Sequence, residues 1–202
     1  MKTYPSIRRE IRNTPIYAFD KLDGSNIRVE WTRKRGFSKY GSRKCLIDSG
    51  HEFLGESIEL FQEKYERDLH DIFKKERYEK STCFFEFYGE NSFAGRHEDE
   101  KHTVTLIDVA PYKKGILEPR EFLRLFDSLE IPKLLYRGNA NQDFVSLVRE
   151  RKLEGMTFEG VVCKAKSGRT PMPLMFKIKS NDWIQRLRDF CRGDDKLFQE
   201  LL

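Results

Sequence analysis

Two strand patterns flank a lysine-containing turn near the N-terminus. Residues 16–20 and 27–31 carry the apolar spacing of buried strands. The segment between them reads Lys-Leu-Asp-Gly-Ser-Asn, and its Asp-Gly pair indicates a tight turn. A lysine that is fixed at a strand end, partly desolvated and next to a turn that admits a phosphate suits nucleophilic attack on phosphorus. Such a lysine, here Lys21, needs acidic and basic partners from the rest of the chain.

The remaining patterns mix strands and helices without regular alternation. Further strands are predicted at residues 37–40, 82–88, 103–109, 158–164 and 174–179. Helices are predicted at residues 56–73, 119–129 and 144–151 and from Trp183 onward. Because strands and helices do not alternate as in βαβ units, we expect an α+β fold with antiparallel sheets flanked by helices. No linker or repeat divides the sequence, so residues 1–202 are expected to form a single domain.

Composition argues against several other classes of protein. Charged residues make up 35% of the chain, and no apolar run is long enough to cross a membrane. The first twelve residues are polar and basic and lack the apolar core of a secretion signal, so we expect a cytoplasmic protein. The cysteines and histidines are scattered without the spacing of a zinc site. Four reduced thiols are therefore expected, at Cys45, Cys83, Cys163 and Cys191.

Positive charge is concentrated in two runs of the sequence. Residues 33–44 hold six basic residues and no acidic one, and residues 164–179 hold five basic residues and again no acid. Basic runs of this kind suit a nucleic-acid backbone, especially where aromatic residues lie between the charges, although a solvated protein face gives the same pattern. The candidates for contact with nucleic acid are Arg33, Lys34, Arg35, Lys39, Lys44, Lys164, Lys166 and Arg169.

Charged side chains also interrupt three apolar strand patterns. Glu86 and Glu159 each stand among apolar residues, and Lys177 and Lys179 share one face of their strand because side chains two residues apart point the same way. Each of them alone would equally suit an exposed sheet edge. With Lys21 they form a coherent set. The two lysines would neutralise a polyphosphate and lower the pKa of Lys21, while the carboxylates would bind a divalent cation and sugar hydroxyls.

The order of these motifs resembles that of the covalent nucleotidyltransferases, which include polynucleotide ligases and RNA capping enzymes. Lys-x-Asp-Gly at residues 21–24 is followed by Phe-Glu-Phe-x-Gly at 85–89, Glu-Gly-Val-Val at 159–162 and Lys-x-Lys at 177–179. The resemblance covers nearly the whole chain. It implies the adenylyltransferase fold of ligase catalytic cores, which is unrelated to the ATP-grasp fold, and a reaction through a lysyl-AMP intermediate.

Asn26 distinguishes between the branches of this family. DNA ligases and capping enzymes usually carry arginine at this place, five positions after the nucleophile, whereas asparagine is similar to the RNA-joining branch of phage T4 RNA ligase 2 and the kinetoplastid editing ligases. Residues 41–43 resemble the next motif of that branch. The resemblance thus implies an ATP-dependent RNA ligase that joins RNA 5′-phosphate and 3′-hydroxyl ends. The alternatives are a DNA ligase, a GTP-using capping enzyme or a catalytically inactive RNA-binding module.

The resemblance also implies roles for individual residues. Lys21 would attack the α-phosphorus of ATP, and Lys177 and Lys179 would stabilise the charge that develops in each displacement. Glu159 would bind Mg²⁺ or Mn²⁺. The nucleotide would contact Asp20, Asp23, Gly24, Asn26, Arg43, Glu86 and Ile107, with Asp20 accepting from the adenine amino group and Glu86 binding the ribose.

Two features depart from the usual pattern of the family. Ile107 stands where the family often has an aromatic residue that stacks on the purine. Few residues follow Lys179, so we expect no OB-fold or other C-terminal domain, and the catalytic core would grip RNA with its own surface. A chain of this length would suit an RNA repair enzyme of a phage or virus, acting in the host cytoplasm.

Overall fold

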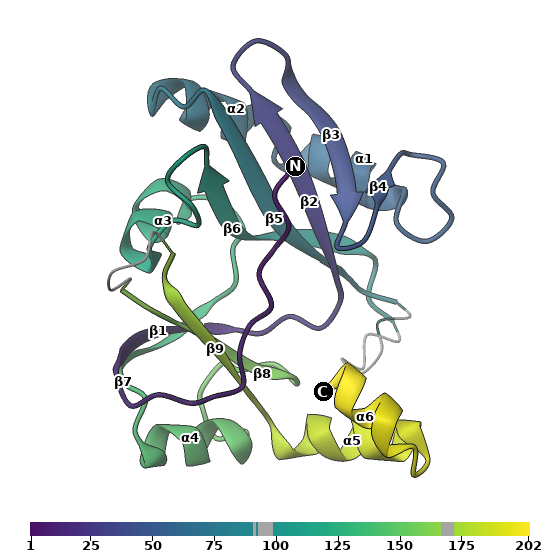
Figure 1. Ribbon diagram of the computed structural model, residues 1–202, viewed down its shortest axis with the longest axis vertical. Helices are drawn as coiled ribbons and strands as arrows, with labels where there is room; N and C mark the ends of the chain where they lie inside the picture. The colour runs from purple at the N-terminus through teal and green to yellow at the C-terminus, as the bar shows by residue number, and fades with distance from the viewer. Residues whose placement is uncertain (91, 93–98, 167–171) are drawn as a thin grey trace.

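The computed structural model describes residues 1–90, 92, 99–166 and 172–202, and two antiparallel sheets form its centre (Figure 1). The strands are β1 (Pro15–Asp20), β2 (Ser25–Thr32), β3 (Gly36–Ser42), β4 (Leu46–Ile47), β5 (Lys80–Tyr88), β6 (Thr103–Pro111), β7 (Leu134–Asn139), β8 (Gly160–Ala165) and β9 (Leu174–Lys179). The first sheet has the order β4-β3-β2-β5-β6 and the second the order β7-β1-β8-β9. The predicted α+β class with antiparallel sheets is confirmed.

Six helices of the described residues surround these sheets. They are α1 (Glu56–Lys64), α2 (Glu66–Lys75), α3 (Pro119–Phe126), α4 (Gln142–Arg149), α5 (Asn181–Cys191) and α6 (Asp195–Leu201). None of the helices in this part of the chain has the length and apolar character that a membrane span requires. All four cysteines are free, and Cys45 alone among them is exposed.

Some sequence predictions of the elements were wrong. The helix predicted at residues 56–73 is interrupted at Tyr65, whose φ of −130° is not helical, and whose hydroxyl donates to the carbonyls of Val104 (3.2 Å) and Glu130 (2.7 Å). Strand β7 was not predicted, because its residues alternate poorly between buried and exposed positions. Strand β8 begins at Gly160, two residues later than expected.

Each sheet has its own hydrophobic core. Helices α1 and α2 lie behind the first sheet in Figure 1, and their residues Ile58, Phe61 and Leu69 pack on its apolar face. The second sheet packs against α4 through Phe144 and Val148. Burial of these apolar faces is the main favourable term that holds each sheet to its helices. A smaller apolar cluster that includes Tyr4, Phe84 of β5 and Met175 of β9 joins the two sheets on another side.

The N-terminal segment crosses from one sheet to the other. Arg28 of β2 donates to the hydroxyl of Thr3 (2.9 Å), and further along the segment the amide of Lys177 in β9 donates to the carbonyl of Arg8 (2.8 Å). Figure 1 shows this segment running in front of both sheets. It therefore forms one wall of the space between them.

The link between β1 and β2 is the most direct connection between the two sheets. Residues 21–24 leave the second sheet at Asp20 and enter the first at Ser25. Gly24 fits here because a Cβ atom would lie 2.2 Å from the carbonyl oxygen of Phe87. The amide of Lys21 donates to the carbonyl of Gly160 (2.9 Å), which fixes the lysine to the start of β8. Lys21 thus lies at the junction of the sheets.

Candidate active site

A cavity of about 740 Å³ lies between the two sheets, and its walls come from distant parts of the sequence. The β1–β2 link and the start of β2 contribute residues 21–26, and the N-terminal segment contributes Tyr4. The first sheet contributes Glu86 and Ile107, and Arg43 comes from the link between β3 and β4. Lys177 and Lys179 come from β9 of the second sheet, and Glu159 directly precedes β8. A cavity of this size matches the usual range of small-molecule sites. All predicted catalytic, nucleotide-binding and metal-binding residues line this cavity.

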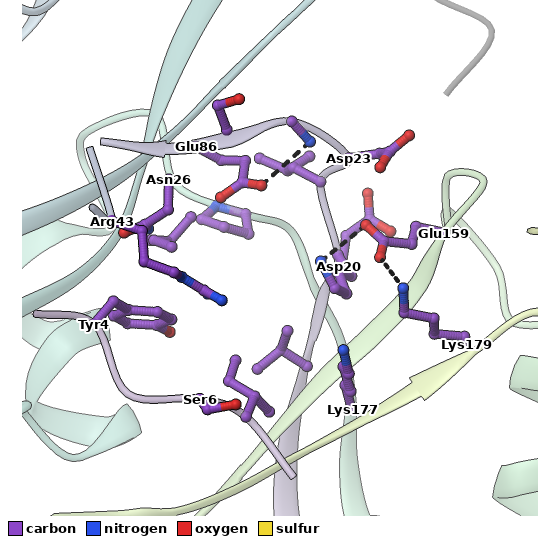
Figure 2. Close-up of a pocket in the computed structure, with 18 of the residues that line it drawn as sticks. Tyr4, Ser6, Asp20, Asp23, Asn26, Arg43, Glu86, Glu159, Lys177 and Lys179 are labelled. Atoms are coloured by element: carbon purple, nitrogen blue, oxygen red, sulfur yellow. Dashed lines mark hydrogen bonds and ion pairs between the residues drawn. The ribbon is translucent and has the colours of Figure 1, made fainter. Parts of the chain in front are cut away.

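Glu159 is the centre of the charged cluster in the cavity. One of its carboxylate oxygens lies 2.8 Å from Lys21 Nζ and the other lies 3.0 Å from Lys179 Nζ. Figure 2 shows Glu159 and Lys179 joined at the edge of the cavity, with Lys177 below them. The side chain of Glu159 is 4% exposed, so both ion pairs are shielded from water. The structure brings together three of the residues that the sequence predicted to act together.

The expected lowering of the pKa of Lys21 is wrong for this structure. Burial does lower the pKa of Lys21, but the ion pair with Glu159 and the field of Glu86 outweigh burial, so the pKa is raised. The prediction failed because it counted the neighbouring lysines without knowing that a carboxylate contacts the amine directly. Lys21 is therefore held in its charged form.

Lys177 and Lys179 have the opposite shift. The pKa of each is lowered to about 8, mainly by burial and also by the positive charge of Lys21, while Glu159 partly compensates. Lys177 Nζ also donates to the carbonyl of Leu202 at 3.0 Å. Both lysines line the cavity from the same strand, as their two-residue spacing predicted. They supply concentrated positive charge beside Lys21.

Glu86 faces the cavity from the first sheet. It is paired in register with Asn26 on β2, and its Oε1 accepts a hydrogen bond from the amide of Gly24 at 3.2 Å. Burial raises the pKa of Glu86 to about 7, although the charge of Lys21 partly offsets this. The charged form of Glu86 is thus unfavourable in the folded protein, and ionisable groups with such shifted pKa values are often found in functional sites.

The cost of Glu86 leads to a prediction about stability. Its folded pKa is about 7 while that of an unfolded glutamate is about 4.3, so the folded state binds more protons between these values and loses stability as the pH rises through them. Glu86→Gln is expected to be more stable than the natural protein by about 2 kcal/mol at pH 8, and to match it near pH 4. Urea denaturation at both pH values measures this difference. The exposed Glu63→Gln is the control, and an equal gain in both variants would contradict the prediction.

Asp20 and Ile107 line the part of the cavity predicted for the base. Asp20 is buried, its Oδ1 accepts from the amide of Thr157 at 3.0 Å, and burial raises its pKa. Ile107 lies at a bulge in the pairing of β5 with β6, which turns its carbonyl toward Lys164 Nζ (2.9 Å). Contacts of Asp20 and Ile107 with adenine remain predictions.

Lys164 is a correction to the predicted nucleic-acid surface. It is buried and pairs with Asp108 Oδ1 at 2.7 Å, and Asp108 also accepts a hydrogen bond from the hydroxyl of Tyr4. Because its ammonium group is enclosed by this partner and by the rings of Phe19 and Phe122, it is not available on an exposed basic face. The sequence contained a hint, since Asp108 is an acid inside an apolar strand and needs a partner.

The other predicted nucleic-acid contacts fall into separate places. Arg43 and Lys44 are exposed and line the cavity. The exposed residues 33–35 form the β2–β3 turn, at the opposite end of β2 from the cavity (Figure 1), and Lys39 lies 3.8 Å from Glu30. The basic residues of the run at 33–44 therefore lie in separate places and do not form one surface. Lys166 is exposed, and Arg169 lies outside the described residues.

Gly160 is a backbone feature of the site that the sequence did not single out as necessary. Its φ is +135°, and a Cβ atom would lie 2.1 Å from the carbonyl oxygen of Ile178. Gly160→Ala is therefore expected to lower the free energy of unfolding by about 3 kcal/mol or more. The control is Gly36→Ala, which also has positive φ (+67°) but no neighbour within 4 Å, and should cost only about 1 kcal/mol. Equal losses in urea denaturation would contradict this account of Gly160.

The acidic residues present suit one divalent cation that also contacts phosphates. The described residues contain no group of three or more histidine, cysteine or acidic side chains that would hold a metal alone. Glu159 offers one carboxylate, and both of its oxygens already attract positive groups. Magnesium is commonly bound by one or two carboxylates together with substrate phosphates, so Glu159 fits that role.

The comparisons with known proteins agree with this geometry at the level of the fold. No protein-family model matches the sequence, and no curated protein matches it. Solved structures do match. An RNA ligase from Naegleria gruberi with pyrophosphate superimposes with a TM-score of 0.67 and 15% identity, covering 94% of this chain and 58% of that one.

Two further structures of RNA ligases share this fold. An archaeal ATP-dependent RNA ligase gives a TM-score of 0.67 at 18% identity, covering 95% of this chain and 52% of the other. A variant of the Naegleria gruberi ligase with ATP and manganese gives 0.63 at 17% identity, covering 86% and 52%. The chain spans 52–58% of the length of these structures. It has the fold of RNA ligase catalytic cores, and a shared fold does not by itself fix the chemistry of a site.

Proposed function

We propose that the chain is an ATP-dependent RNA ligase that acts through a lysyl-AMP intermediate. The observation that carries this proposal is the cluster of Lys21, Glu159 and Lys179, held in a cavity at the junction of the two sheets. The fold shared with RNA ligases adds to it. An inactive RNA-binding module would not need a buried carboxylate between two lysines in a nucleotide-sized cavity.

Lys21 is the nucleophile in this proposal. Its amine attacks the α-phosphorus of ATP, so that a nitrogen–phosphorus bond forms and the bond to pyrophosphate breaks. AMP then passes to an RNA 5′-phosphate, and a 3′-hydroxyl displaces it to join the ends. Because its pKa is raised, Lys21 is protonated while it is paired with Glu159, and this pair is the state before reaction. The amine must leave this pair and lose its proton before it can attack.

Lys177 and Lys179 stabilise the negative charge that develops in the transition state. Both lie on the side of the cavity that contains Glu159, and pentacovalent phosphorus carries more negative charge than the ground state. A divalent cation, Mg²⁺ or Mn²⁺, would be held by Glu159 and would neutralise charge on the phosphates. The nucleoside is contacted by other residues that line the cavity: Glu86 accepts from the ribose hydroxyls, while Asp20, Asp23, Gly24, Asn26, Arg43 and Ile107 surround the rest.

The RNA end would approach along the exposed basic residues at the cavity mouth. Arg43 and Lys44 line the cavity and are exposed, which supports a role for them in contacting RNA phosphates. The exposed turn at residues 33–35 lies at the far end of β2, too far away to contact the same phosphate. It would reach only a more distant part of the RNA. RNA with 5′-phosphate and 3′-hydroxyl ends is the proposed substrate.

A panel of nicked and single-stranded substrates tests this function. The protein is incubated with ATP and Mg²⁺ and with 5′-phosphorylated RNA or DNA, and products are scored for sealed strands and for adenylylated ends. Sealed RNA with ATP supports the proposal. Sealing of DNA only would favour a DNA ligase, and adduct formation with GTP in place of ATP would favour a capping enzyme. RNA binding without an adduct or pyrophosphate release would favour an inactive binding module.

A further inference from the structure

Trp183, near the start of α5, contacts the ammonium group of Lys179. Lys179 Nζ lies 3.1 Å from the centre of the indole ring. Trp183 is 3% exposed, and it lines the same cavity as Lys21 and Glu159. A cation over the face of an aromatic ring is attracted by the negative charge density of that face, most strongly where water is excluded. The ring therefore restricts where the ammonium group can lie.

The backbone around Ser180 fixes this ring to the carboxylate side of the site. The hydroxyl of Ser180 accepts from the amide of Trp183 (3.1 Å) and donates to the carbonyl of Phe158 (2.7 Å). The amide of Ser180 donates to the carbonyl of Glu159 at 2.9 Å. Ser180 is fully buried and serves as the N-cap of α5. Glu159, Lys179 and Trp183 are thus held by one hydrogen-bonded corner.

A ring and a carboxylate hold an ammonium group in different ways. Glu159 accepts one N–H donor of Lys179, and the same carboxylate also accepts a hydrogen bond from Lys21. The Trp183 ring attracts the charge without supplying a competing anion, so donors of the ammonium group stay available for a phosphate oxygen. If Glu159 turns to another cation during the reaction, the ring still holds Lys179.

We propose that Trp183 is a positioning residue for the nucleotidyl transfer step, holding the Lys179 ammonium group against the reacting phosphate. This inference rests on the ligase chemistry proposed above for the same cavity. It extends that proposal to a residue that none of the sequence motifs contains. Trp183 acts through Lys179 and does not itself touch the reacting atoms.

The test is a double-mutant cycle on the first chemical step. Trp183→Leu keeps an apolar side chain but removes the π face, and should slow single-turnover adenylylation about tenfold with little change in the KM for ATP. Trp183→Phe keeps a π face and should recover most of the rate. In a Lys179→Met background, Trp183→Leu should have no further effect, because the interaction is already lost. An equal loss in both backgrounds would overturn the proposal and assign Trp183 to general packing.

A binding measurement separates this inference from the proposed function. The chain has two tryptophans, so the Trp183 signal is the difference between the natural protein and Trp183→Phe, in which Trp31 alone remains. Adding inorganic pyrophosphate should change the fluorescence of the natural protein and leave that of the variant unchanged. Identical responses would overturn the placement of Trp183 beside the phosphates. Absence of a protein–AMP adduct in the natural protein would instead contradict the ligase function.

Discussion

Replacing Lys21 with arginine is expected to abolish the transfer of label from α-labelled ATP to the protein, a loss of roughly a thousandfold or more. Arginine keeps a positive charge that can pair with Glu159, which lies 2.8 Å from the natural ammonium group. Its guanidinium does not deprotonate in proteins and so cannot attack phosphorus. The variant therefore separates nucleophilicity from charge. Labelled adduct on a denaturing gel measures the effect.

Two companion variants make the result on Lys21 specific. Lys21→Ala should also abolish the adduct, but it additionally leaves Glu159 with one cationic partner fewer and should lower stability. Lys75→Ala removes an exposed lysine of α2 and should leave labelling unchanged. If Lys21→Arg retained labelling while remaining folded in thermal melts, Lys21 would not be the nucleophile.

Glu159→Gln is expected to reduce adduct formation by about a hundredfold or more and to destabilise the fold by about 3 kcal/mol at pH 7. The amide keeps the shape of the side chain but removes the only carboxylate that contacts both Lys21 and Lys179 in the part of the chain described here. Two ammonium groups would then remain buried without their partner. The exposed Glu154→Gln, five residues earlier, is the matched control.

The loss of stability in Glu159→Gln should depend on pH, which gives a second test of the ion pair between Glu159 and Lys179. In Glu159→Gln the folded pKa of Lys179, already lowered to about 8, falls further, while an unfolded lysine stays near about 10.4. The unfolded variant then binds more protons than the folded one, so its stability should rise with pH between these values. Urea denaturation at pH 7 and pH 10 measures the difference in free energy of unfolding between the natural protein and the variant. This difference should be smaller at pH 10 than at pH 7. A difference that is constant or that widens would contradict the ion-pair account.

The sequence identified charged residues that line the cavity because each of them stands out within a short segment. A turn that carries Lys21, an acid in a strand such as Glu86, and two lysines at two-residue spacing are each readable within a few residues. Strand periodicity alone placed Lys177 and Lys179 on one face, and both line the cavity. The α+β class followed from the lack of alternation between helices and strands.

The remaining features depend on which distant residues meet, which one sequence does not show. Lys164 looked like part of a basic run, but it pairs with Asp108 of the other sheet, 56 residues earlier. The raised pKa of Lys21 depends on Glu159, which is brought to it by the pairing of β1 with β8. Trp183 carried the periodicity of a packing helix and gave no sign of its contact with Lys179. In each case a long-range contact decided the outcome.

The central claim is that Lys21 carries the nucleotide, and peptide mapping tests it most directly. The protein is incubated with ATP and Mg²⁺, digested, and analysed by tandem mass spectrometry under conditions that preserve an acid-labile nitrogen–phosphorus bond. We expect one AMP on the peptide that contains Lys21, removed when pyrophosphate is added back to the intact protein. AMP on another residue, or sealed RNA without any AMP on Lys21, would contradict the account.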